Sequence, residues 1–197
     1  MYRRFFVDLE LVARNFPEIG AGKHLLDIGG GDGELINHLA RRFPTLKVTM
    51  MDIASKIGNF VEAQYLNNVE MLPATSMADY RGKYLSNNPI DYILVSDVIH
   101  HVPPAHRPQF FKDLALLVNN GTTIIIKDIE PGYIKSKLSY WADKYISGDK
   151  TVSLTSRKEA VDYMKIIFPQ INYYETKLLS QNRPNFCMVF TFTAALV

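Results

Sequence analysis

A run of glycines between a strand-like segment and a helix-like segment is the feature that most constrains the fold. Residues His24–Ile28 are mostly apolar, as in a buried strand, and Gly29-Gly30-Gly31-Asp32-Gly33 follows them directly. Residues 34–43 then place apolar side chains at helical spacing. Glycine adopts backbone angles closed to other residues and lets a ligand approach the main chain, and a helix N-terminus offers N–H donors. The segment therefore predicts a strand–loop–helix unit with a ligand at the loop.

The alternation of strands and helices continues along the chain. Further strands are expected at 47–51, 69–72, 91–96 and 121–129, and further helices at 3–16, 55–66, 104–118, 133–146 and 158–168. Strands separated by helices imply crossover connections, which predict a parallel sheet with helices on both faces. The helix at 3–16 carries Phe5, Leu9, Val12 and Phe16 on one face, and we expect that face to pack on the domain.

The end of the chain follows a different pattern. Two strands are expected at 172–179 and 186–194, and six residues, 180–185, connect them. Such a connection is too short to hold a crossover helix, so this last pair must be antiparallel. The sequence thus predicts an α/β fold whose mostly parallel sheet ends in an antiparallel hairpin.

Composition narrows the class of protein. With 197 residues, 47% hydrophobic and 21% charged, the chain is expected to form a single globular domain over 1–197. The net charge of +2 comes from interspersed residues, which argues against a nucleic-acid partner. The single cysteine, Cys187, excludes an internal disulfide. No segment has the apolar core of a signal peptide or a membrane span, so we expect a cytoplasmic protein without stable membrane insertion.

The glycine run has an acidic-x-Gly-x-Gly-x-Gly pattern that begins at Asp27. With this pattern the chain resembles the class I S-adenosylmethionine-dependent methyltransferases, in which the loop wraps the methionine end of the cofactor. In that family an acidic residue ending the second strand binds the ribose hydroxyls. Asp52 ends the second expected strand, 19 positions after Gly33, close to the ~20 residues expected for a ribose-binding acid. The resemblance implies a Rossmann-like, seven-stranded sheet.

The resemblance also implies a set of cofactor-binding residues for S-adenosylmethionine. They are Asp27, Gly29, Gly30, Gly31, Gly33, Asp52, Ile53, Ser76, Met77, Ser96 and Asp97. Many relatives carry an acid near the adenine amine just after the third strand, but here Asp79 comes late, and Thr75 or Ser76 is the alternative. A nicotinamide-dependent oxidoreductase is the alternative function, although its Gly-x-Gly-x-x-Gly fingerprint would have Glu34 at the last glycine position.

The expected reaction side follows the strands at 91–96 and 121–129. His100 and His101 come after the first of these strands and Asp128 lies near the end of the second, so all three belong at the ligand edge of the sheet. A histidine, with a free pKa near ~6.5, can accept a proton from a hydroxyl at neutral pH. Asp128 is expected to orient or charge-balance a histidine, or to form an ion pair with Lys127 or another base. The resemblance implies no metal, because metal-dependent relatives usually carry an Asp-Asn pair and no Asn follows Asp128.

The paired histidines are similar to those of small-molecule methyltransferases, including enzymes that act on hydroxyls of sugars or aromatic natural products in secondary metabolism. Residues 131–150 are rich in aromatic side chains and are expected to cover the substrate, with the helix within 1–20 as a second wall. Such a pocket suits an aromatic, acyl or sugar hydroxyl on a free or carrier-bound acceptor. A non-catalytic cofactor-binding subunit is a further alternative, and the oligomeric state stays open.

Overall fold

The computed structural model of the chain describes residues 7–86, 89–145, 152–169, 171, 173–179 and 184–192. Phe5, residues 146–150 of the expected cover and most of the expected hairpin turn lie outside the described residues, as do the side chains of several residues in the helix near 140.

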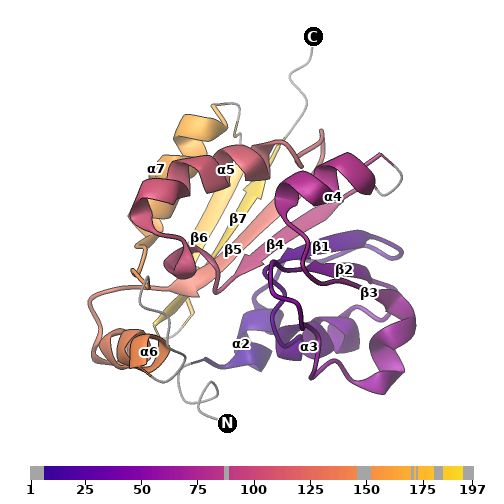
Figure 1. The fold of residues 1–197 in the computed structure, drawn as a ribbon, viewed down its shortest axis with the longest axis horizontal. Helices are drawn as coiled ribbons and strands as arrows, with labels where there is room; N and C mark the ends of the chain where they lie inside the picture. The colour runs from indigo at the N-terminus through magenta and orange to yellow at the C-terminus, as the bar shows by residue number, and fades with distance from the viewer. Residues whose placement is uncertain are drawn as a thin grey trace.

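A seven-stranded sheet forms the centre of the molecule, with strand order β3-β2-β1-β4-β5-β7-β6 (Figure 1). The strands are β1 His24–Ile28, β2 Lys47–Met51, β3 Val69–Leu72, β4 Tyr92–Ser96, β5 Thr123–Ile129, β6 Tyr173–Leu178 and β7 Asn185–Thr191. The first five strands pair in parallel, and β7 is antiparallel to both β5 and β6. The predicted fold class, a mostly parallel sheet with a terminal hairpin, is confirmed.

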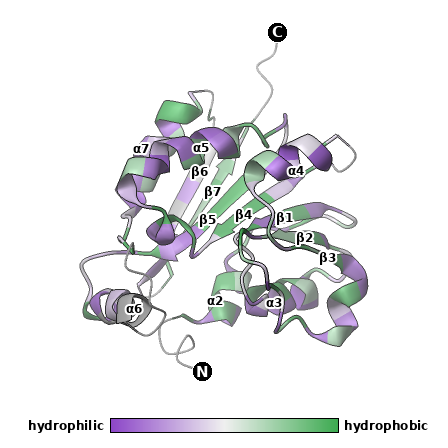
Figure 2. Ribbon diagram, viewed as in Figure 1, coloured by the Kyte–Doolittle hydropathy of each residue, from purple (hydrophilic) through white to green (hydrophobic). Residues whose placement is uncertain are grey.

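Helices cover both faces of the sheet. They are α2 Leu9–Arg14, α3 Glu34–Arg42, α4 Met77–Lys83, α5 Arg107–Ala115, α6 Ile134–Tyr145 and α7 Arg157–Ile167, with short 3-10 helices η1 Ala63–Asn68, η2 Ile99–His101 and η3 Pro104–His106. In Figure 1, α4, α5 and α7 lie on one side of the sheet and α2 and α3 on the other. The strands between these two layers are largely hydrophobic, as Figure 2 shows.

Each face of the sheet has its own core. Phe111 and Met164, from α5 and α7, are buried in the core that includes Phe186 and Phe190 of β7. On the other face, α2 packs on α3. Leu9, Val12 and Phe16 are buried there, as the spacing of the expected N-terminal helix predicts, although that helix begins at Leu9. None of the described helices has the length and apolarity needed to cross a bilayer.

The prediction of a helix over 55–66 is wrong for most of its length, since only η1 forms near its end. The backbone of this segment serves the glycine loop instead. The N–H of Gly58 donates to the carbonyl of Gly31, and the N–H of Phe60 donates to that of Asp32, both at 2.8 Å. The buried amide of Asn37 donates to the Phe60 carbonyl at 2.7 Å. These contacts hold the segment against α3 in a loop conformation.

Two smaller differences concern helices. The prediction missed α4, whose signal is a capping box in which Ser76 and Asp79 bond each other's backbone N–H. The helix expected over 104–118 is divided into η3 and α5. The aromatic-rich segment does form a helix, α6, between β5 and α7.

Candidate functional site

A cavity of about 1020 Å³ opens at the carboxyl edge of the parallel strands. In open α/β sheets, ligands bind at this edge. With one exception, every residue proposed from the sequence lines the cavity: Asp27, Gly29, Gly30, Gly31, Gly33, Asp52, Ile53, Ser76, Met77, Ser96, Asp97, His100 and His101. The exception is Asp128, which lies behind His100. Fold and topology thus bring together residues from the carboxyl ends of four strands, β1 to β4, and from the loops that follow them.

The glycines of the loop have different reasons to be glycine. A Cβ on Gly29 would meet Val98 Cγ2 at 2.5 Å, and a Cβ on Gly33 would collide with Val61, so these two positions are closed by packing. A Cβ on Gly31 would meet nothing nearer than the Gly29 carbonyl oxygen at 3.8 Å. Gly31 also has φ +53°, in the left-handed region. Its exposed backbone is therefore the part of the loop that an incoming ligand can approach.

Asp52 is held against the same loop by backbone donors. Its Oδ2 accepts a hydrogen bond from the N–H of Gly31 at 3.2 Å, and its Oδ1 accepts one from the N–H of Ala54 at 2.9 Å. The carboxylate is part-exposed and lines the cavity beside Ile53, whose side chain is 82% exposed. The carboxylate can accept hydrogen bonds from a pair of neighbouring ligand hydroxyls, and the exposed Ile53 side chain offers an apolar contact beside it.

The residues after β3 start a helix. The Ser76 hydroxyl accepts from the N–H of Asp79 at 3.2 Å and donates to the Asp79 carboxylate at 2.6 Å. These bonds lower the pKa of Asp79. Ser76, Thr75 and Met77 line the cavity and Asp79 does not, so the acid that comes late in the sequence is engaged as a helix cap.

His100, which lines the cavity, forms a buried pair with Asp128 behind it. The imidazole Nδ1 lies 2.5 Å from Asp128 Oδ1, and the two side chains are 2% and 0% exposed. Asp128 also accepts from the backbone N–H groups of His100 and Ile129 at 3.2 and 2.8 Å. If Nδ1 donates its hydrogen to the carboxylate, the lone pair of the neutral imidazole is on Nε2. The pair therefore has the geometry of a histidine oriented by an acid.

A second buried pair lies next to the first. Lys127 Nζ donates to both carboxylate oxygens of Asp97, at 2.5 and 2.7 Å, and the lysine is fully buried. Asp97 has φ +58°, unusual for a residue other than glycine. The alternative interpretation of Asp128 as the partner of Lys127 is wrong, because successive side chains of β5 point to opposite faces of the sheet.

Asp97, His100 and Asp128 each offer a ligand atom within 4.8 Å of the others, which is close enough for a metal ion. In the present arrangement the ammonium of Lys127 already neutralises Asp97, and Asp128 contacts His100. The three side chains that could bind a metal are thus already engaged in two hydrogen-bonded pairs.

The loop that carries His100 is braced by Arg107. Its Nε donates to the carbonyl of Val102 at 3.1 Å, and its Nη1 donates to Glu159 at 2.8 Å. Its Nη2 donates to the carbonyl of Ser153, whose own N–H donates to the His100 carbonyl at 2.8 Å. The Arg107 side chain is 2% exposed and does not line the cavity. Its hydrogen bonds therefore hold the backbone of η2 without occupying the ligand site.

Val7, in the N-terminal segment expected to form a second wall, lines the cavity. Sequence reasoning missed several other lining residues, namely Phe60, Phe110, Asp113, Lys127, Ile129 and Asn185. Lys127 had a signal, since it is a charged residue inside a β-branched strand. Phe110 and Asp113, three apart on α5, had none. No residue of α6 whose side chain is described lines the cavity, and the cover expected over 131–150 stays a prediction. His101 is exposed at the cavity mouth, and its ring lies 4.1 Å from that of His100.

Comparisons with solved structures agree on the architecture. An O-methyltransferase family protein from Burkholderia thailandensis matches with TM-score 0.68 and 15% identity, over 95% of this chain and 55% of its own. A SAM-dependent methyltransferase from Archaeoglobus fulgidus matches with TM-score 0.70 and 13% identity, over 96% and 97%. An O-methyltransferase family 2 protein from Planctomyces limnophilus, in complex with apigenin, gives 0.67 and 16%, over 91% and 55%. At such identities the likeness concerns the fold.

This chain spans about half the length of the first and third of these structures. A search of curated proteins finds no match. The profile of a family described as "Methyltransferase domain" matches residues 2–165, which is most of the chain. The chain therefore belongs to this methyltransferase-domain family, whose cofactor is S-adenosylmethionine.

Proposed function

We propose that the protein transfers a methyl group from S-adenosylmethionine to a hydroxyl oxygen of a small, largely apolar molecule, with His100 as the general base. The observation that carries the proposal is the buried His100–Asp128 pair at the edge of the cofactor cavity. The bound cofactor supplies an electrophilic methyl group. The protein has to bind it at the glycine loop, orient the acceptor in line and remove the acceptor's proton.

The residues of the cavity fit these tasks. Gly31 and Asp52 hold the cofactor on the β1–β2 side, where the open backbone and the carboxylate lie together. On the β4–β5 side, His100 Nε2 accepts the hydroxyl proton, and Asp128 holds the ring and balances the imidazolium charge that forms. Apolar lining residues such as Phe110, Ile129 and Val102 favour an aromatic or acyl acceptor, free or on a carrier.

The test is an acceptor screen with isotope-labelled S-adenosylmethionine over phenols, hydroxy-acyl compounds and sugars, with products identified by mass spectrometry. We expect methylation at oxygen, lost in Asp128→Asn and His100→Gln and retained in His106→Gln, a surface histidine outside the cavity. Products methylated at nitrogen or carbon, or oxygen products formed equally well by His100→Gln, would overturn the assignment of the base. Cofactor binding without any turnover over the whole panel would favour the non-catalytic subunit.

A further inference from the structure

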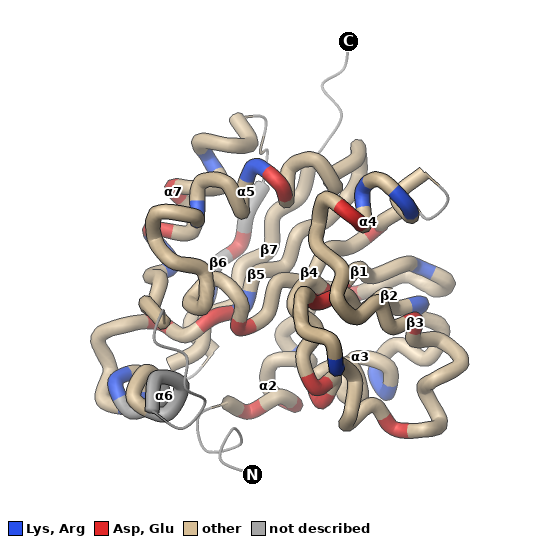
Figure 3. The backbone as a smooth tube through the Cα atoms, viewed as in Figure 1, with Lys and Arg blue, Asp and Glu red and all other residues tan. Residues whose placement is uncertain are grey.

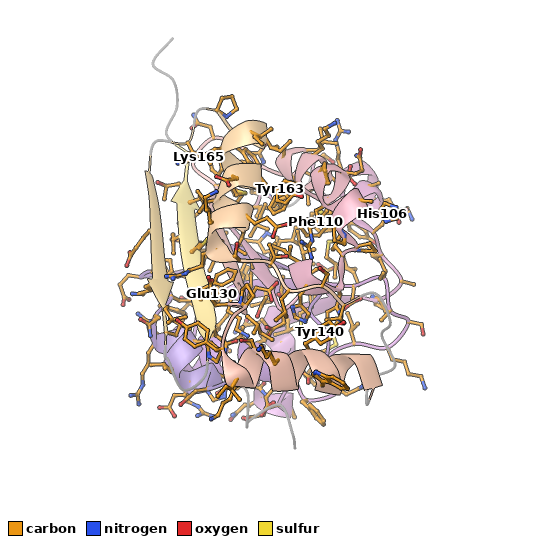
Figure 4. All side chains as sticks on the ribbon, turned by 90° about the vertical axis from the view of Figure 1, so that its left-hand side faces the viewer. His106, Phe110, Glu130, Tyr140, Tyr163 and Lys165 are labelled. Atoms are coloured by element: carbon orange, nitrogen blue, oxygen red, sulfur yellow. The ribbon has the colours of Figure 1, made fainter. Side chains whose placement is uncertain are left out.

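Among the residues of helix α6 whose side chains are described, two large apolar ones are exposed. Ile134 is 81% and Trp141 59% exposed. These residues are seven apart, so they share one helical face. Ser136 is fully buried on the other side, where its hydroxyl both accepts from the N–H of Tyr133 and donates to its carbonyl, at 3.1 and 3.0 Å. Figure 4 shows part-buried Tyr140 on the side of α6 that faces the domain. The exposure of Ile134 and Trp141 differs from the usual surface helix, in which large apolar side chains face the core.

Charge accompanies the apolar face. Lys135 and Lys137 are the charged residues of α6 in the part whose side chains are described, and Lys137 is exposed. Figure 3 shows this part of the helix with blue and no red segments. Elsewhere in the same view, red and blue segments are interspersed. A helix with Ile and Trp on its exposed side and lysines beside them has the composition of helices that lie in the headgroup region of a membrane.

A hydrogen-bonded pair joins the two ends of the segment that contains α6. Glu130 and Arg157 stand on either side of the segment that contains the helix, and Glu130 Oε2 accepts from the backbone N–H and the Nε of Arg157, at 3.0 and 3.2 Å. Ile129, immediately before Glu130, lines the cavity. The segment that contains α6 therefore leaves and rejoins the domain next to the cavity.

We propose that α6 is a docking surface for an anionic lipid bilayer, on which the protein binds reversibly and from which apolar acceptors reach the cavity. Ile134 and Trp141 enter the headgroup–acyl boundary, and Lys137 lies at the level of the lipid phosphates. One helix with few large apolar residues gives weak, salt-sensitive association, not insertion. This role goes beyond methyl transfer, and the docking itself needs neither cofactor nor acceptor.

Trp141 is the only tryptophan of the chain, so intrinsic tryptophan fluorescence reports on α6 alone. The intact protein is titrated with vesicles of phosphatidylcholine and with vesicles containing equal amounts of phosphatidylcholine and phosphatidylglycerol. We expect a shift of the emission to shorter wavelength with the anionic vesicles, quenching by brominated acyl chains, and weakening at high salt. Unchanged emission together with no co-sedimentation on the anionic vesicles would overturn the proposal.

Variants separate the contributions and test alternative occupants. Ile134→Ser should weaken partitioning about tenfold, and Lys137→Gln about fivefold. Ile166→Ser is the matched control, because Ile166 is a 74% exposed isoleucine on α7, and it should leave binding unchanged. All three changes are at exposed positions, and circular dichroism checks their folding. An emission shift that requires only higher protein concentration would assign the face to a second copy. A shift on adding S-adenosylmethionine without vesicles would make α6 a closing cover. Either result would overturn lipid docking.

Discussion

The two halves of the cavity are built by different means. On the β1–β2 side, backbone atoms form most of the site. The glycines leave the main chain accessible to a ligand, and the N–H groups of Gly31 and Ala54 position Asp52. On the β4–β5 side, buried side-chain pairs do it, with His100 on Asp128 and Asp97 on Lys127. A backbone site can serve an invariant cofactor, whereas a site of paired side chains can be altered for each acceptor. We therefore expect substitutions of His100 to lower turnover, and substitutions of Asp52 and Gly31 to lower cofactor affinity.

The largest expected effect concerns the reaction side. His100→Gln removes the group that accepts the proton, so turnover of a hydroxyl acceptor should fall by ~10²–10⁴-fold, the usual contribution of a positioned base. Affinity for S-adenosylhomocysteine, measured by calorimetry, should remain close to that of the wild type. His101→Gln is the neighbouring control, and a smaller loss is expected because His101 lies at the exposed rim. Equal losses in the two variants would argue against His100 as the base.

Turnover should also decline as the pH falls, because a protonated imidazole cannot accept the proton. The decline belongs to the reaction side alone, so calorimetric cofactor binding should not follow the same profile. A pH profile of kcat that is unchanged in His100→Gln would assign the titration to another group.

The second prediction breaks the other buried pair. Lys127→Met leaves the Asp97 carboxylate, 16% exposed, without its cation. Removal of one partner from a buried pair costs ~3–5 kcal/mol, and we place this variant toward the lower end since Asp97 is partly reached by water. The measurement is the free energy of unfolding from urea titration. The double variant Lys127→Met/Asp97→Asn should recover part of the loss, and a double variant no more stable than the single one would show that the pair is not the cause.

On the cofactor side, Asp52→Ala should weaken binding of S-adenosylhomocysteine by about 1.5–3 kcal/mol, since two ribose hydroxyls lose a charged acceptor. Calorimetry gives this value directly. Stability should change less than in Lys127→Met, because Asp52 is part-exposed. Unchanged affinity would remove Asp52 from the cofactor site.

The smallest effect on folding is expected at Gly31. Gly31→Ala adds a Cβ that meets no atom within ordinary contact distance, but φ +53° costs about 1–2 kcal/mol for a residue with a side chain. Cofactor affinity should fall nonetheless, because the new methyl group stands where the ligand approaches. In Gly33→Ala the new Cβ collides with Val61, so the midpoint temperature of thermal unfolding should fall more than in Gly31→Ala. The reverse order would mean that the loop opens at Gly33.

Local patterns in the sequence were sufficient for most of the architecture. The bounds of β1, β2 and β3 agree with those expected from alternation and β-branched runs, and the short final connection required the antiparallel hairpin. Candidate cofactor residues could likewise be proposed, because the glycine run and Asp52 resemble the pattern of a known methyltransferase family. These features depend on a few residues that are close together in the chain, so they can be predicted from the sequence alone.

The tertiary structure alone decided how the parts pair. Asp128 faces His100 and Lys127 faces Asp97 because the pleat of β5 sends adjacent side chains to opposite faces of a sheet whose neighbours come from distant segments. Most of the helix expected over 55–66 does not form, because the N–H groups of Gly58 and Phe60 are hydrogen-bonded to carbonyls of the glycine loop. Similarly, the sequence predicts the helix α6. It does not predict that Ile134 and Trp141 are exposed, because their exposure depends on which surfaces of the folded domain lie next to the helix.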